Sequence, residues 1–184
     1  MRSSNFLFAV EHTSTPAVSP ASVGIRYGLF VGIIASILSF LQMSFIQDPE
    51  TPFRWLSTVV SIVGIWLAHK QFKQVNAGFM SYGQGLGIGT ILSVVAGLIS
   101  SVFGYLYVSF IDPAYMNRVM ELQRAKMEAR GMDDAQIEQG MAMAEKFSSG
   151  PIVILFGLIL VVIIGFVISL IVSAFTKHTR PEFE

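Results

Sequence analysis

The sequence predicts an all-α integral membrane protein, a four-helix bundle that carries an extramembrane helical hairpin between its third and fourth spans. Four long stretches contain no formal charge, and all 24 charged residues (12 basic and 12 acidic) lie outside them: 27–47, 55–69, 74–111 and 147–176. A helix needs roughly 20 apolar residues to cross a bilayer core of about 30 Å. Hydrophobic residues make up 53% of the chain and charged residues 13%, which leaves too little polar surface for a soluble protein of this length. The one long connection between spans, 112–149, is polar and favours helix.

The segment before the first span is rich in serine, threonine, proline and alanine. We expect residues 1–22 to form a disordered arm, because their apolar residues form no sustained run beyond 6–10. A signal peptide would need a basic start, a compact apolar stretch and a cleavage site, and the first long apolar run continues without one. The first span is therefore expected to remain as an anchor in a membrane domain over 23–178, followed by a short polar tail, 179–184.

The predicted spans cover about 26–47, 52–70, 84–111 and 151–176. The first begins beside Arg26 and Tyr27, a cation and an aromatic residue that suit the membrane interface. The second has only 15 uncharged residues, about 22 Å of helix, and needs the long side chains of Arg54 and Lys70 to reach the interface. A re-entrant hairpin is the alternative for this span. Pro151 suits the first turn of the fourth.

The cations close to the spans predict that both termini are cytoplasmic. With the amino terminus inside, the first outer loop offers only Arg54, whereas six cations collect on the inner side: Arg2, Arg26, Lys70, Lys73, Lys177 and Arg180. The connection 112–149 holds five cations, but it also holds seven acids and its cations lie mostly far from the span ends. We therefore expect this connection to lie outside.

Helix caps predict two helices in the connection. Asp112 and Pro113 can serve as an N-cap and first-turn pair, and the helix that follows reaches Arg130, where Gly131 supplies a stop. A second helix can begin at Asp133, with Gln136 three residues later completing a capping box. The expected result is a helical hairpin.

One face of each hairpin helix is apolar and rich in methionine. Its residues are Met116, Val119, Met120 and Met127 on the first helix and Ile137, Met141 and Ala144 on the second. Either the two faces pack on each other or on the outer leaflet, or they form an adaptable surface for lipid or for another membrane or envelope protein. Met141 and Met143 form a single Met-x-Met, a weak basis for a copper(I) site without a histidine nearby, so no metal or cofactor is expected.

Small residues recur every four positions in two of the spans. They are Gly28, Gly32 and Ser36 in the first span and Gly85, Gly89, Ser93, Gly97 and Ser101 in the third. Such stripes favour close helix packing. The alternative for the third span is a broken helix over 83–89 that lines a substrate or ion path. A shift of 57 positions aligns the two stripes, which reflects either a duplication or chance likeness between apolar spans.

Catalytic chemistry finds little support in this sequence. His12, His69 and His178 are isolated in three segments, and the spans contain no acid that could orient a nucleophile. His69 is interpreted as an interfacial residue, and the serines of the spans as hydrogen-bonding to their own helix backbone or to a neighbouring helix. The net charge is zero and no basic stripe is interleaved with aromatics, which argues against a nucleic-acid partner.

Several short motifs occur in a recognisable order. Arg-Tyr-Gly opens the first span at 26–28, Met-Ser-Tyr-Gly-Gln precedes the third at 80–84, and Phe-Ile-Asp-Pro closes it at 110–113. With the acidic, methionine-bearing insertion that follows, the chain resembles the bacterial family catalogued as domain-of-unknown-function family 4199. The resemblance implies a four-span protein of the bacterial inner membrane and supplies no catalytic residues.

These observations favour a non-enzymatic membrane protein, an assembly, accessory or sensing component that contacts lipid and acts through its hairpin. A small transporter or channel is the alternative. It would be a homo-oligomer, because four spans enclose little space.

Overall fold

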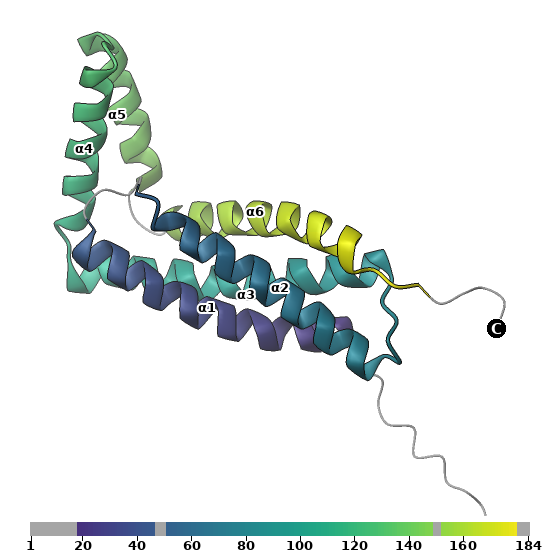
Figure 1. Ribbon diagram of the computed structural model, residues 1–184. Helices are drawn as coiled ribbons and strands as arrows, with labels where there is room; N and C mark the ends of the chain where they lie inside the picture. Colours follow the sequence, from purple (N-terminus) through teal and green to yellow (C-terminus); the bar gives the residue numbers. More distant parts are fainter. Residues whose placement is uncertain (1–17, 47–50, 149–151, 180–184) are drawn as a thin grey trace, which may run out of the picture.

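The computed structural model describes residues 18–46, 51–148 and 152–179, and over these it confirms an all-α fold (Figure 1). The helices in chain order are α1 (Pro20–Phe45), α2 (Arg54–Val75), α3 (Tyr82–Leu106), the π-helical turn η1 (Tyr107–Ile111), α4 (Tyr115–Ala129), α5 (Asp134–Ser148) and α6 (Ile152–Thr176). Within the described ranges β-pairing is limited to one isolated antiparallel bridge, between Met80 and His178.

Four helices, α1, α2, α3 and α6, lie side by side, and the hairpin of α4 and α5 projects from one end of this bundle (Figure 1). Helix α3 is central, with α1 packed on one side and α6 on the other. Helix α1 runs parallel to α3, whereas α2 and α6 run the opposite way, so α1 and α3 begin where α2 and α6 end. The hairpin stands at the other end.

Three helical segments are long and apolar enough to cross a membrane: Pro20–Phe45, Tyr82–Ile111 and Ile154–Thr176. Large apolar side chains such as Phe30 and Leu160 are more than half exposed on them, as on a surface that faces lipid. The chain is therefore a membrane-embedded protein. Helix α2 lacks this apolar character because His69, Lys70 and further polar residues fill its second half. It is nevertheless one continuous helix of 22 residues, about 33 Å long, so the re-entrant hairpin is wrong.

The helix boundaries follow local capping. Helix α1 begins at Pro20, three residues inside the predicted arm, because the Ser19 hydroxyl accepts a hydrogen bond from the Ser22 amide at 3.1 Å and Pro20 suits the first turn. Helix α2 continues five residues past the predicted end of the second span. The remainder of the predicted arm (1–17), Pro151 and the last five residues of the tail (180–184) lie outside the described residues.

Helix α3 begins with a capping box that the sequence analysis did not anticipate. The Ser81 hydroxyl accepts from the Gln84 amide at 3.2 Å, and the Gln84 side chain accepts from the Ser81 amide at 2.8 Å. The glycine-rich stretch 83–89 therefore lies in a continuous helix, and the alternative of a broken helix there is wrong. The irregular turn instead comes at the far end, at η1.

The local sequence signals predicted the helix ends correctly at the tip of the hairpin but not at its base. The Asp133 capping box forms as predicted, with Gln136 donating at 2.8 Å and accepting at 3.2 Å. Gly131 ends α4 with a φ of +76°, a left-handed conformation that glycine adopts without strain. Asp112 is not the N-cap of α4, which begins at Tyr115 after Ala114; its carboxylate pairs with the Arg118 guanidinium.

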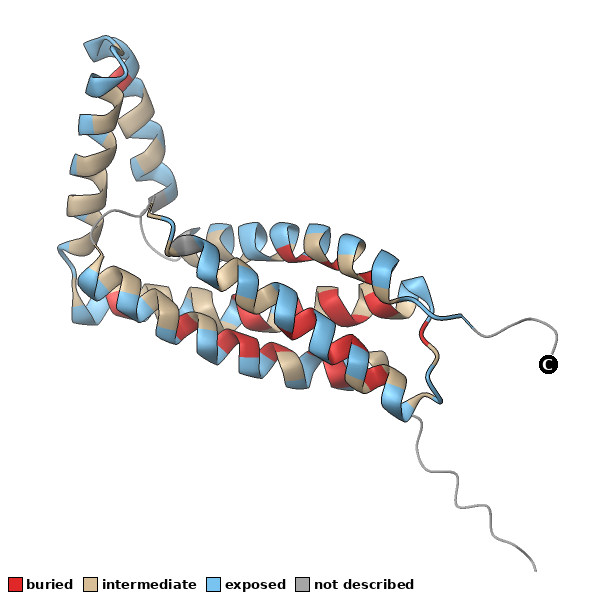
Figure 2. Ribbon diagram, viewed as in Figure 1, coloured by how far each residue is buried: buried red, intermediate tan, exposed pale blue. Residues whose placement is uncertain are grey.

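The hydrophobic core lies toward the end of the bundle that holds the termini (Figure 2). Its buried members come from three helices and the α2–α3 connection, and partly buried Ile168 and Val172 of α6 pack against them: Val23, Val31, Ile65, Ala68, Phe72, Met80, Ile88, Leu92 and Ala96. Helix α2 contributes buried residues only from its second half, from Gly64 onward. Its first half, 54–63, lies more loosely against the bundle.

Candidate functional site

The small residues of α1 face α3. A Cβ atom added at Gly28 would lie 2.7 Å from the Val95 Cβ atom, and one at Gly32 would lie 2.9 Å from the Ile99 Cδ1 atom. Ser36, next on the same stripe, is buried and donates to the Gly32 carbonyl at 2.8 Å. These contacts leave no room for larger side chains, so the stripe allows the two backbones to approach closely.

The small residues of α3 face α6, which has a matching stripe of its own. A Cβ atom at Gly85 would lie 2.9 Å from the Ser173 hydroxyl, and one at Gly89 would lie 2.7 Å from the Ser169 Cβ atom. Farther along, a Cβ atom at Gly97 would lie 3.0 Å from the Leu158 Cδ1 atom. Serines of α3 fit the glycines of α6 in turn, Ser93 against Gly165 and Ser101 against Gly157. The period-four pattern of 157, 165, 169 and 173 could have revealed the second stripe from the sequence.

Gly28 and Gly85 are equivalent under the 57-position shift, yet they contact different helices. Gly28 faces α3, whereas Gly85 faces α6. In a two-plus-two duplication α3 would correspond to α1 and α6 to α2, so the equivalent stripes would meet equivalent neighbours. The similarity between the two spans is therefore not matched by equivalent packing.

The predicted partner surface of the hairpin divides into a packed part and an open part. Near the tip, Ile137 is only 2% exposed and Met127 lies directly over Gly140. Val119 is half-buried. Toward the base, Met116, Met120 and Met141 line a groove of about 490 Å³ together with Asn117, Glu138, Ala142 and Glu145. The charged side chains among these lining residues are two glutamates, which makes the rim of the groove acidic.

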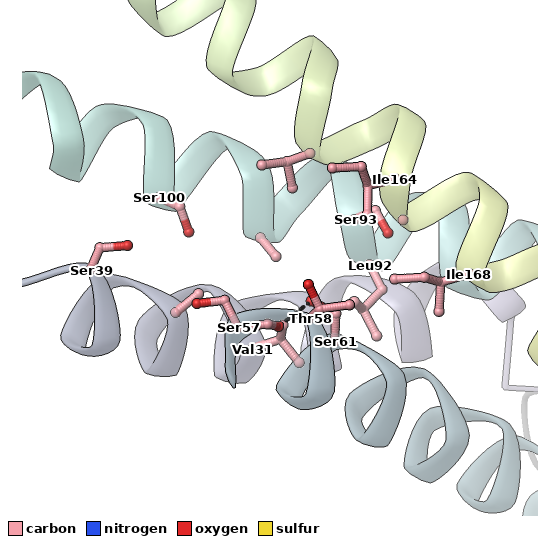
Figure 3. Close-up of a pocket in the computed structure, with 14 residues that line it drawn as sticks. Val31, Ser39, Ser57, Thr58, Ser61, Leu92, Ser93, Ser100, Ile164 and Ile168 are labelled. Carbon is pink, nitrogen blue, oxygen red and sulfur yellow. Dashed lines mark hydrogen bonds between the residues drawn. The ribbon is translucent and has the colours of Figure 1, made fainter. Parts of the chain in front are cut away.

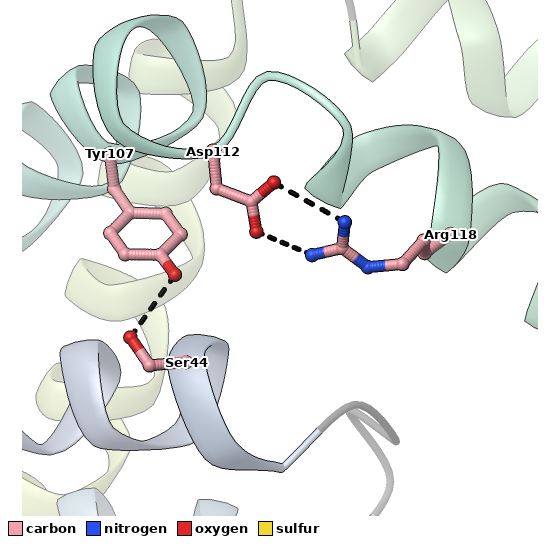
Figure 4. Close-up of polar contacts among 4 residues, drawn as sticks. All are labelled: Ser44, Tyr107, Asp112 and Arg118. Carbon is pink, nitrogen blue, oxygen red and sulfur yellow. Dashed lines mark hydrogen bonds and ion pairs between the residues drawn. The ribbon is translucent and has the colours of Figure 1, made fainter.

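Both ends of the hairpin are attached to the bundle by specific contacts. Tyr107 is 3% exposed, and its hydroxyl lies 3.1 Å from the Ser44 hydroxyl (Figure 4). Its ring meets that of Tyr115 edge to face at 6.1 Å between centroids. At the other end, Phe147 of α5 meets Phe156 of α6 at 4.6 Å between ring centroids. These contacts fix α4 to η1 and α5 to α6.

An ion pair braces the first turn of α4. The Arg118 guanidinium binds both carboxylate oxygens of Asp112, one of them at 3.3 Å from the Nη1 atom (Figure 4). This two-point geometry is the strong arrangement for an arginine and a carboxylate. The same hydrogen bonds hold the pKa of the Asp112 carboxyl below its usual range.

His69 is fully buried where α2, α3 and α6 meet, so its interpretation as an interfacial residue is wrong. Its Nε2 atom lies 2.9 Å from the Gly85 carbonyl oxygen and its Nδ1 atom lies 2.8 Å from the Thr176 hydroxyl. Lys73 donates to the Thr176 carbonyl at 3.2 Å. The helical spacing of Ile65, Ala68, His69 and Phe72 on one face was the signal for this burial.

The contacts of His69 are structural in kind. They join the ring to a backbone carbonyl and to a threonine hydroxyl that itself donates to the Val172 carbonyl at 2.8 Å, so each partner belongs to the packing of the helices. Of the other histidines, His178 stacks on Phe79 and His12 lies outside the described residues. Among the described residues no group of three His, Cys, Asp or Glu lies close enough to hold a metal ion.

A family model described as "Protein of unknown function (DUF4199)" matches residues 26–178. The chain belongs to the DUF4199 family. This match confirms the resemblance to the family that the sequence motifs predicted. Comparisons with curated proteins and with solved structures gave no match. The DUF4199 match runs from the first turns of α1 to the residues just after α6, so the hairpin and its groove are part of the family domain.

Proposed function

We propose that this DUF4199 protein is a non-enzymatic binding component of a membrane, an assembly, accessory or sensing protein whose hairpin groove receives another membrane or envelope protein. The observation that carries the proposal is the open groove beside Met116, Met120 and Met141 on a hairpin fixed at both ends. Methionines that only packed the hairpin together would leave no such groove.

The chemistry of the groove indicates the kind of segment that fits it. Methionine side chains are flexible and polarisable, so they adapt to varied apolar surfaces. Glu138 and Glu145 stand seven residues apart on α5, two turns along one face, and both are exposed. An amphipathic helix with an apolar face flanked by lysine or arginine matches this arrangement.

The proposal places the hairpin on the outer side of a bacterial inner membrane, with four crossing helices and both termini in the cytoplasm. Arg26, Lys70, Lys73 and Lys177 support this orientation, because they belong to the end of the bundle that holds the termini. The antiparallel course of α2 beside α1 supports a fourth crossing despite its polar second half.

The experiment is photo-crosslinking in cells from probes at Met120 and Met141, with Arg124 and Gln139 as exposed control positions on the same helices. We expect a discrete crosslinked protein from the groove positions alone. The same band should be lost when Glu138 and Glu145 are both replaced by lysine. Crosslinks only to lipid or within one chain, or equal crosslinking from the control positions, would contradict the proposal. Crosslinks between copies would make the partner a second DUF4199 chain.

The transporter or channel alternative depended on a broken helix at the start of the third span. Helix α3 is continuous through 83–89, with Gly85 and Gly89 packed against the serines of α6. This alternative has therefore lost the observation that motivated it.

A further inference from the structure

We infer that the bundle contains a binding site for a small uncharged amphiphile, in a cavity between α1, α2, α3 and α6. The cavity has a volume of about 210 Å³. For comparison, an apolar protein cavity of about 150 Å³ is large enough to bind benzene. The site is separate from the hairpin groove and goes beyond the proposed function.

The cavity exists because α2 packs closely along only half its length. From Gly64 onward α2 is pressed against its neighbours by Ile65, Ala68 and Phe72, each at most 2% exposed. Before this point, the residues that α2 presents to the cavity carry small hydroxyl side chains, Ser57, Thr58 and Ser61, and these leave space that larger side chains would have filled.

Six hydroxyl side chains from three helices line this space (Figure 3). They are Ser39 of α1, Ser57, Thr58 and Ser61 of α2, and Ser93 and Ser100 of α3. Ser61 and Ser93 donate to carbonyls of their own helices at 2.9 and 2.8 Å, but a hydroxyl oxygen that donates can still accept. The cavity therefore offers both donors and acceptors to a ligand.

The remaining walls are apolar, and none of the described lining residues is charged. Val31, Leu92, Ile164 and Ile168 are among the apolar lining residues. A charged ligand would lose its hydration here without a counter-charge, which is strongly unfavourable. A molecule with a compact apolar body and one hydroxyl or carbonyl group matches both kinds of wall. The apolar, lipid-facing surface of the bundle implies access from the bilayer, where such molecules concentrate.

Two sources can supply this chemistry, a free small amphiphile or the uncharged glycerol-ester region of a membrane lipid. The probe that tests both is an octan-1-ol derivative with a diazirine at carbon 3, applied to the full chain in lipid nanodiscs and activated by light. Peptide mass spectrometry should place the label on cavity-lining residues, with protection by excess octan-1-ol. If the cavity residues are labelled only after lipid has been removed, the natural ligand is a membrane lipid. If they are labelled while lipid is still present, the natural ligand is a free amphiphile.

Matched variants test whether the cavity is responsible. Ala35 lines the cavity and Ala174 is exposed on α6, so Ala35→Phe should fill the site and Ala174→Phe should not. We expect Ala35→Phe to reduce labelling about tenfold or more, with Ala174→Phe close to wild type. Label confined to lipid-facing residues, or unchanged by Ala35→Phe, would overturn the inference.

A second variant keeps the test decisive if Ala35→Phe fails to fold. Ser57→Ala combined with Ser100→Ala removes two hydroxyls and only two atoms of volume, so the helical content and the monodispersity of the protein should be preserved. The octan-1-ol concentration that gives half-protection should rise about tenfold for each hydrogen bond lost. An unchanged concentration in a folded double variant would show that the hydroxyls do not recognise the ligand.

Discussion

Replacing the buried His69 separates the contribution of its hydrogen bonds from that of its volume. His69→Leu keeps a side chain of similar size and removes two interhelical bonds, to the Gly85 carbonyl and the Thr176 hydroxyl. Such bonds contribute about 0.6 to 1.7 kcal/mol each in membrane proteins, so the free energy of unfolding should fall by about 1 to 3 kcal/mol. His69→Ala also opens a cavity and should cost about 3 to 5 kcal/mol.

The measurement is equilibrium unfolding in mixed micelles, with Lys70→Leu as the control. Lys70 is exposed, with its ammonium 5.6 Å from the Trp66 ring centroid, and its replacement should change the unfolding free energy by less than about 0.5 kcal/mol. A double-mutant cycle of His69→Leu with Thr176→Val isolates one bond and should give a coupling of about 0.6 to 1.7 kcal/mol. A His69→Leu protein as stable as wild type, or a coupling near zero, would refute the reasoning.

Three further predictions concern the packing stripes and the hairpin base. Gly89→Ala should destabilise the bundle by about 1 to 3 kcal/mol, because a Cβ atom at position 89 collides with α6. A Cβ atom at Gly87 meets nothing within 4 Å, so Gly87→Ala should stabilise the bundle by about 0.5 to 1 kcal/mol in the same unfolding assay. Among the described residues the buried Ser173 hydroxyl has no hydrogen-bond partner. Ser173→Ala removes this unsatisfied group and should leave the midpoint of thermal unfolding unchanged or raise it. The Arg118 contact lowers the folded-state pKa of Asp112, so its stabilising effect is complete above the unfolded-state pKa of about 3.9 and is lost as pH falls from that value through the folded-state pKa. Hydrogen exchange at the start of α4 should accelerate in this acidic range. Asp112→Asn should abolish this pH dependence.

The sequence predicted the helices and the hairpin because their signals are local. Burying a charge in lipid is costly, so the uncharged runs mark the helices without any knowledge of their neighbours. The Asp133 capping box is set by two residues three positions apart. Asp112 has the same capping chemistry, but α4 begins two residues later than predicted and the Asp112 carboxylate pairs with Arg118 six residues away, a contact that capping rules do not include.

The arrangement of the helices was not predictable in the same way. A small-residue stripe shows that another helix can approach closely, but it does not indicate which helix does so. The contacts of Gly28 with α3 and of Gly85 with α6 could therefore be seen only in the structure. The burial of His69 depends on which face of α2 meets the bundle. The cavity depends on how closely the first half of α2 packs, which is a property of the whole bundle.

The alternation of serine and glycine between α3 and α6 has a consequence for the thermodynamics of association. The hairpin connects these same two helices, and their interlocked side chains, such as Ser169 against Gly89, oppose sliding and rotation. The distance between the two ends of the hairpin is therefore set before any partner arrives. The proposed binding of a partner in the groove would then cost little conformational entropy in the hairpin itself, and more of the contact energy would be available as affinity.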